Sequence, residues 1–109
     1  MTRARVSPDL KSLMPRARKA SAFLKALAHE NRLIILCLLC ERERSVTELE
    51  ELLAANQAAV SQQLARLRHE GLVETRREGR TIYYSLADDA TKRFIKAIYD
   101  KFCGPRAKA

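Results

Sequence analysis

The sequence predicts a mainly α fold of the α+β class: four helices, a two-stranded hairpin and a fifth helix. Two observations lead to this prediction. Apolar residues recur at helical spacing along most of the chain, whereas between Val73 and Leu86 they alternate with polar ones, as in strands. With 109 residues, the chain has the length of a single domain. We expect that domain to span residues 7–104, with a flexible basic tail at 1–6 and a short C-terminal tail at 105–109.

The chain is strongly basic, with 21 Lys and Arg residues against 13 Asp and Glu and a net charge of +8. This balance favours a polyanionic partner, nucleic acid first and an anionic membrane surface second. No apolar run reaches the length of about 18 residues that crosses a membrane, and the N-terminus lacks the apolar core of a secretion signal. Three cysteines, an odd number, do not suit a secreted disulfide framework. We therefore expect a cytoplasmic protein without membrane attachment.

The first helix is predicted to begin at Ser7-Pro8-Asp9, which offers a capping hydroxyl, a proline at the first helical position and an acid near the positive helix end. Apolar residues follow at helical spacing, namely Leu10, Leu13, Met14, Ala17, Ala20, Phe23, Leu24 and Leu27. Pro15 lies inside that run and is expected to kink or split the helix. His29-Glu30-Asn31 then leads to a second helix, from Arg32 to about Arg42, which is apolar nearly all round and should be buried.

A third and a fourth helix are predicted in quick succession. Ser45 caps the third helix, and Glu48 three residues later completes a capping box. Residues 54–56 form a turn, and the fourth helix runs from about Gln57 to Glu70, where Gly71 ends it.

After the fourth helix, apolar residues recur at every second position instead of at helical spacing. Residues 73–76 and 82–86 are predicted to form a β-hairpin, with Gly79 at the turn because glycine readily takes a positive φ. Asp88-Asp89 caps the last helix, which ends at Gly104-Pro105, directly after Cys103.

Two short helices joined by a tight turn and followed by a hairpin form a winged helix-turn-helix. The fourth helix turns its apolar residues inward and leaves small amides, hydroxyls and cations for reading base edges in the major groove. The predicted DNA-binding residues are Gln57, Ser61, Gln62, Gln63 and Arg66 on this helix, with Arg76, Arg77 and Arg80 on the hairpin, suited to phosphates or a minor groove. The alternative for both groups is a solvated polar surface.

Four stretches of the chain resemble the ArsR/SmtB family of winged-helix repressors. They are F-L-K-A-L-A-H-E-N-R-L-I-I-L (23–36), S-V-T-E-L-E-E-L-L (45–53), Q-A-A-V-S-Q-Q-L-A-R-L-R-H-E-G-L-V (57–73) and R-R-E-G-R-T-I-Y-Y-S-L (76–86). The resemblance implies a homodimer built from the first and last helices, two recognition helices on a palindromic operator in double-stranded DNA, and derepression by an effector.

The resemblance also bears on the effector. Many family members hold a metal through a Cys-x-Cys motif on the third helix, where this chain has Ser45-Val46-Thr47, or through Asp and His on the last helix, which has no histidine here. No metal site and no cofactor are therefore predicted. The stretches L-I-I-L-C and I-Y-D-K-F-C resemble the BigR/SqrR branch, whose members sense reactive sulfur species. The resemblance assigns the redox pair to Cys37 and Cys103, whereas Cys40 departs from the branch and is interpreted as packing.

The predicted function is that of a homodimeric repressor. It binds operator DNA when reduced and is released when persulfides or polysulfides link Cys37 to Cys103, and it controls sulfide-responsive genes. Two alternatives stay open: a general thiol-redox repressor that responds to peroxide or disulfides, and an architectural DNA-binding protein without sequence specificity. An enzyme is not expected, because neither of the two histidines lies in a recognised motif with a nucleophile.

Overall fold

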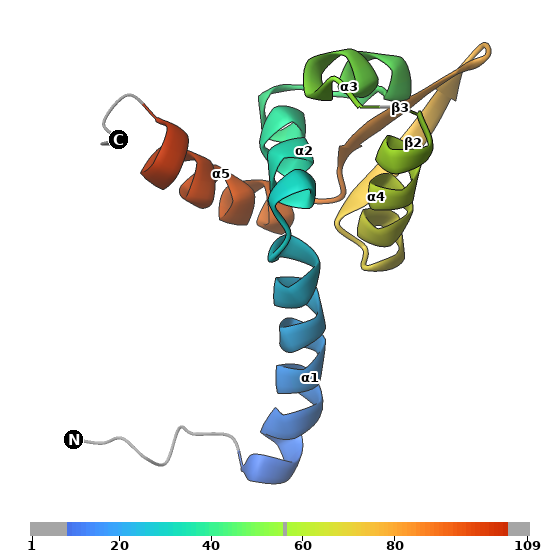
Figure 1. Ribbon diagram of the computed structural model, residues 1–109. Helices are drawn as coiled ribbons and strands as arrows, with labels where there is room; N and C mark the ends of the chain where they lie inside the picture. The colour runs from blue at the N-terminus through green and yellow to red at the C-terminus, as the bar shows by residue number, and fades with distance from the viewer. Residues whose placement is uncertain (1–8, 56, 105–109) are drawn as a thin grey trace.

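The computed structural model describes residues 9–55 and 57–104 (Figure 1). The elements in chain order are α1 (Leu10–Leu27), α2 (Glu30–Glu41), β1 (Arg44–Ser45), α3 (Val46–Leu53), α4 (Gln57–His69), β2 (Val73–Glu78), β3 (Thr81–Leu86) and α5 (Asp89–Cys103). The predicted mainly α fold with a hairpin is confirmed, with β1 as an additional strand. The predicted tails at 1–6 and 105–109 lie outside the described residues, so the domain boundaries stay predictions.

The helix α1 projects away from the rest of the fold (Figure 1). Its N-cap is Asp9, whose side chain accepts a hydrogen bond from the Ser12 amide at 2.9 Å. The predicted cap at Ser7 lies outside the described residues, and the acid expected in the first turn acts as the cap instead. The helix is continuous through Pro15, so the proline does not split it.

The boundaries of α2 differ from the prediction, whereas those of α3 and α4 agree closely. The helix α2 begins at Glu30, not Arg32, because His29 takes the extended conformation of an N-cap. The capping box of α3 is confirmed: the Ser45 hydroxyl accepts from the Glu48 amide at 3.1 Å, and the Glu48 carboxylate accepts from the Ser45 amide at 3.0 Å. Gly71 takes a φ of +76° after α4, as its place at the helix end predicts.

The sheet has three antiparallel strands in the order β1-β3-β2. The predicted hairpin is β2–β3, in which Val73 pairs with Leu86 and Glu78 with Thr81, and Gly79 takes a φ of +64° in the turn. The strand β1 was missed by the sequence analysis because two residues are too short to show an apolar period. It pairs Arg44 with Tyr84 and Ser45 with Tyr83.

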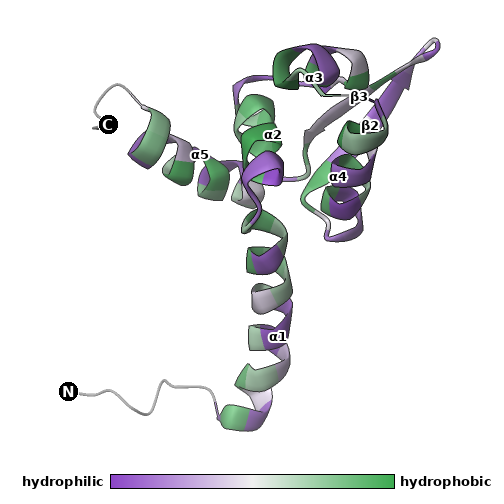
Figure 2. Cartoon of the chain, viewed as in Figure 1, coloured by the Kyte–Doolittle hydropathy of each residue, from purple (hydrophilic) through white to green (hydrophobic). Residues whose placement is uncertain are grey.

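The core is a single apolar cluster to which all five helices and the hairpin contribute. Its members are Ala26, Leu27, Ile35, Leu36, Leu39, Leu49, Val60, Leu64, Leu67, Leu72, Val73, Leu86 and Ile95. Three of these come from α2, as its nearly continuous apolar sequence predicted. Figure 2 shows further apolar residues along α1 and α5, where these helices leave the core. Leu10, Leu24 and Phe102 are more than half exposed there.

Candidate functional site

The outer face of α4 carries most of the residues predicted to read DNA. Val60, Leu64 and Leu67 are buried and fix the helix against the core. The side chains of Gln57, Ser61, Gln62 and Arg66 are exposed. Arg66 also faces Glu70 at 3.6 Å, one helical turn along. The structure therefore leaves these four side chains available to a ligand of the helix-turn-helix α3–α4.

Gln63 lies differently from the other predicted readers. Its side chain is half-buried, and its amide oxygen accepts a hydrogen bond from the Arg32 guanidinium at 3.1 Å. The same guanidinium donates to the backbone oxygens of Ala26 at 2.7 Å and Lys25 at 3.5 Å. Gln63 thus connects the recognition helix to the end of α1. The sequence carried a signal for this, because Gln63 follows Val60 by three residues and shares its inward side.

The three hairpin arginines have different surroundings. Arg76 makes a two-bonded ion pair with Glu43 at 2.8 Å, contacts Glu78 at 3.3 Å and lies over the Tyr83 ring at 4.6 Å. These contacts raise the pKa of Arg76 and hold its guanidinium against the side of the hairpin. Arg77 and Arg80 are exposed, and neither forms an ion pair with another described residue. Near the turn, these two arginines are the hairpin cations available to phosphates.

The structure brings Cys37 and Cys103 to one pocket between α2 and α5. This cavity of about 240 Å³, called the thiol pocket below, is lined mainly by apolar side chains. Its lining residues are Leu33, Ile34, Cys37, Leu38, Glu41, Ile98, Tyr99, Phe102 and Cys103. Both cysteines are free thiols. Two residues 66 positions apart in sequence are therefore close enough to share one cavity.

The two thiols differ in burial. Cys37 is half-buried, and burial, followed by the influence of Cys103, Cys40 and Glu41, raises the pKa of its thiol to about 11. Cys37 is therefore protonated near neutral pH, which makes it a weak nucleophile until it loses its proton. Cys103 is exposed at the last position of α5. Of the two, Cys103 is the thiol that a reagent in solution meets first.

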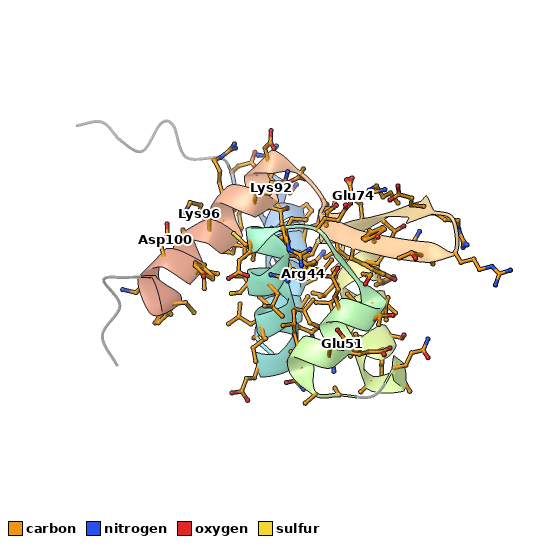
Figure 3. The ribbon with its side chains drawn as sticks, turned by 90° about the horizontal axis from the view of Figure 1, so that it is seen from above. Arg44, Glu51, Glu74, Lys92, Lys96 and Asp100 are labelled. Carbon is orange, nitrogen blue, oxygen red and sulfur yellow. The ribbon has the colours of Figure 1, made fainter. Side chains whose placement is uncertain are left out.

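Sequence reasoning missed a polar connection at the edge of the thiol pocket. The Tyr99 hydroxyl donates to the Glu41 carboxylate at 3.0 Å, which raises the pKa of Tyr99. The other Glu41 oxygen accepts from Arg44 at 2.7 Å, and Arg44 also donates to the Leu38 backbone oxygen at 3.1 Å. Figure 3 shows Arg44 at the centre of the molecule, and its side chain is only 10% exposed. Since Glu41 and Tyr99 lie 58 residues apart, no local sequence pattern could predict the contact.

Neither a metal site nor a membrane-spanning helix is present among the described residues. Within residues 9–55 and 57–104, no group of three or more His, Cys, Asp or Glu side chains is arranged to hold a metal ion. None of the described helices has the length and apolar character needed to cross a membrane.

Comparison with known proteins places this fold and site in a family. The model of the bacterial regulatory protein arsR family matches residues 29–75. The biofilm growth-associated repressor of Agrobacterium fabrum is 46% identical over 96 residues, covering 88% of this chain and 82% of the relative. The chain belongs to the ArsR family. The transcriptional activator HlyU of Vibrio cholerae is 42% identical, covering 87% of this chain and 88% of the relative.

Solved ArsR-family structures show the same fold. The transcriptional repressor BigR from Xylella fastidiosa has a TM-score of 0.78 and 38% identity, over 93% of this chain and 100% of that one. Mb0332 from Mycobacterium bovis, described as a homodimeric winged helix-turn-helix DNA-binding domain, has a TM-score of 0.73 and 33% identity, over 87% and 86%. The predicted winged helix-turn-helix and the resemblance to ArsR proteins, BigR among them, are thus confirmed. The family consists of transcription regulators, which agrees with the expectation that this chain is not an enzyme.

Proposed function

We propose that this ArsR-family protein is a homodimeric transcriptional repressor that responds to reactive sulfur species in the cytoplasm. It binds operator DNA while its thiols are reduced, and it leaves the operator when persulfides or polysulfides link Cys37 to Cys103. The genes it controls respond to sulfide. The observation that carries the proposal is the thiol pocket, in which two free cysteines from α2 and α5 line one apolar cavity.

The properties of the two thiols suggest an order of events. The exposed Cys103 takes the outer sulfur of a small persulfide, which departs as a thiol. A second persulfide adds another sulfur in the same way and gives Cys103–S–S–SH. The Cys37 thiolate then attacks the sulfur bonded to Cys103 Sγ, and the terminal sulfur leaves as hydrosulfide, so one added sulfur atom joins the two residues. Cys37 must lose its proton in this step. The apolar lining favours the neutral thiol until then.

A cavity between the thiols also bears on which oxidant is preferred. A direct disulfide requires the two Cβ atoms to approach to about 3.5–4.5 Å. Extra sulfur atoms in the bridge relax that requirement. The thiol pocket, at about 240 Å³, has room for added sulfur atoms beside the two cysteines.

The DNA-binding surface is proposed to combine the outer face of α4 with the tip of the hairpin. Gln57, Ser61, Gln62 and Arg66 read or position base edges, and Arg77 and Arg80 contact phosphates or the minor groove. Gln63 and Arg76 are proposed to help position this surface, because Gln63 is hydrogen-bonded to Arg32 and Arg76 is paired with Glu43.

The second copy of the chain is proposed to cover the apolar faces of α1 and α5. Leu10, Leu13, Met14, Phe94 and Phe102 are between 41% and 69% exposed, and all lie on these two helices. Exposed apolar side chains gathered on neighbouring elements are typical of a protein interface. A related winged-helix domain, Mb0332, is described as homodimeric. A C2 dimer places two recognition helices about one DNA turn apart, roughly 34–36 Å.

The experiment that tests this function treats the reduced protein separately with a persulfide donor, oxidised glutathione and peroxide. Products are mapped by intact and peptide mass spectrometry, and operator binding is measured on each. We expect Cys37 and Cys103 to be joined with added sulfur mass by the persulfide donor alone, together with loss of operator binding. The Cys40→Ala variant is the control, because it removes a thiol outside the bridge and should respond like the parent.

Other results would assign a different function. Equal reaction with all three oxidants would indicate a general thiol-redox repressor. Failure to distinguish operator from random DNA, in the reduced state, would indicate an architectural DNA-binding protein.

A further inference from the structure

A second and larger pocket adjoins the thiol pocket. It has a volume of about 450 Å³ and is bounded by the C-terminal end of α2, the end of β3 and the first turns of α5. Cys40, Lys92, Arg93 and Lys96 are among its lining residues. Glu41 lines both cavities, so its hydrogen bond with Tyr99 lies between them. We call this cavity the cationic pocket.

The charge of the cationic pocket is positive on balance. Arg42, Lys92, Arg93 and Lys96 line it, against the carboxylates of Glu41 and Glu43. Both carboxylates are already paired with arginines that do not line the cavity. Arg44 contacts Glu41 at 2.7 Å, and Arg76 contacts Glu43 at 2.8 Å. Arg42 is likewise paired with Glu48, which does not line the cavity, so the cations of α5 are the ones that make the pocket positive.

The cations of α5 are available to a ligand. Figure 3 shows Lys92 and Lys96 in succession along α5. Lys92 lies 4.0 Å from Asp89 and Lys96 lies 3.1 Å from Asp100, in pairs whose lysine side chains are 59% and 66% exposed. Ion pairs this exposed are weak, so both ammonium groups are free to turn toward an anion. Arg93 is exposed and forms no ion pair within the described part of the chain.

We propose that the cationic pocket binds a small organic anion. Its carboxylates contact Lys92, Arg93 and Lys96, and its apolar part lies against Leu39 and Leu86. The volume falls within the range of small-molecule sites, about 300–1,000 Å³. The half-buried Cys40 places a thiol beside the bound anion. Glu41 lines this pocket as well as the thiol pocket, so the bound anion lies near the carboxylate that the two cavities share. This site is independent of persulfide chemistry at Cys37 and Cys103.

The first test compares iodoacetate with iodoacetamide as alkylating agents of Cys40 in the reduced full-length protein. The two reagents share size and leaving group and differ in charge. The measured quantity is the alkylation rate of Cys40 by iodoacetate divided by its rate by iodoacetamide. We expect this ratio to fall at least about threefold in the double variant Lys92→Gln/Lys96→Gln. The matched control, Lys11→Gln/Lys19→Gln, removes the same charge from α1 and should keep the parent ratio. An unchanged ratio in the α5 variant, or an equal fall in the control, overturns the proposal.

The second test asks whether an unreactive anion protects Cys40 from iodoacetamide. The probe is S-methylglutathione, which carries two carboxylates, compared with its diethyl ester and with duplex DNA. We expect S-methylglutathione to slow alkylation of Cys40 in the parent and not in Lys92→Gln/Lys96→Gln, and the ester to have no effect. Absence of protection at millimolar concentration overturns the proposal. Protection by duplex DNA alone also overturns it, because these cations would then be contacts to DNA phosphates.

Discussion

Replacing Tyr99 with Phe removes one hydroxyl from the connection between the thiol pocket and the DNA-binding part of the molecule. In the parent, that hydroxyl donates to Glu41 at 3.0 Å and joins α5 to the end of α2. A hydrogen bond to a charged group contributes about 1.5–3 kcal/mol. Tyr99 is only half-buried and the Glu41 side chain is 44% exposed, so solvent weakens the bond. We therefore expect a contribution below that range, at about fivefold in an equilibrium constant.

The expected result is a loss of coupling without a loss of DNA binding. Reduced Tyr99→Phe should bind operator about as well as the parent, because Tyr99 lies on α5 and its hydroxyl bonds to α2, not to α4 or the hairpin. Linking Cys37 to Cys103 lowers the operator affinity of the parent by some factor, and this factor should be about five times smaller in Tyr99→Phe. The assay is fluorescence anisotropy with labelled operator, on reduced and linked protein at one salt concentration.

The control for this prediction is Tyr84→Phe. Tyr84 packs against the core, and its hydroxyl forms no hydrogen bond with another described residue. It should therefore keep the parent's full loss of affinity on linkage. If Tyr99→Phe loses as much affinity as the parent on linkage, the Tyr99–Glu41 bond does not transmit the signal.

Three further results are expected. The pKa of Cys37 is about 11, so its thiolate fraction rises about tenfold per pH unit below that value. Closure of the sulfur bridge should therefore accelerate from pH 7 to pH 10, measured by rapid quenching and mass spectrometry. A rate that does not depend on pH would contradict this. Gln62→Ala should reduce the discrimination between bases at one operator position by about 1–3 kcal/mol. Gln63→Ala should mainly lower the free energy of unfolding, by about 1 kcal/mol as measured by urea denaturation. The reverse pattern would place Gln63 in the DNA groove. Arg77→Ala/Arg80→Ala removes two cations from each protomer of the dimer and should reduce the slope of log affinity against log salt by about 4. An unchanged slope would exclude the hairpin tip from the DNA interface.

Elements with a long apolar period could be predicted from the sequence. The helices α3 and α4, the hairpin and the capping box at Ser45 were all predicted, because each depends on residues within a few positions of one another. The two-residue strand β1 and the start of α2 were not, since neither has a period of its own. Such boundaries are decided by contacts with distant parts of the chain.

The candidate site, like the fold, could be predicted only where it depends on residues close together in the sequence. Residue type and helix position indicated which side chains of α4 are polar, yet the engagement of Gln63 by Arg32 and of Arg76 by Glu43 depends on tertiary packing. The pairing of Cys37 with Cys103 was predicted through a family resemblance. The structure has both residues in the lining of one cavity, and a covalent link between them stays a prediction. The surroundings that raise the pKa of Cys37 could not be predicted from spacing, because burial is the largest cause of that shift.

The strand that the sequence did not reveal explains why Tyr99, and not Glu41, is the residue to replace. Arg44 in β1 donates to Glu41 and to the Leu38 backbone oxygen of α2, while its own backbone pairs with Tyr84 of the hairpin. The next residue, Ser45, caps α3. With only 10% of its side chain exposed, Arg44 would lose its carboxylate partner if Glu41 were neutralised, which would destabilise the fold in addition to breaking the Tyr99 bond. Arg44 therefore connects Glu41, at the edge of the thiol pocket, to the hairpin and to the start of α3.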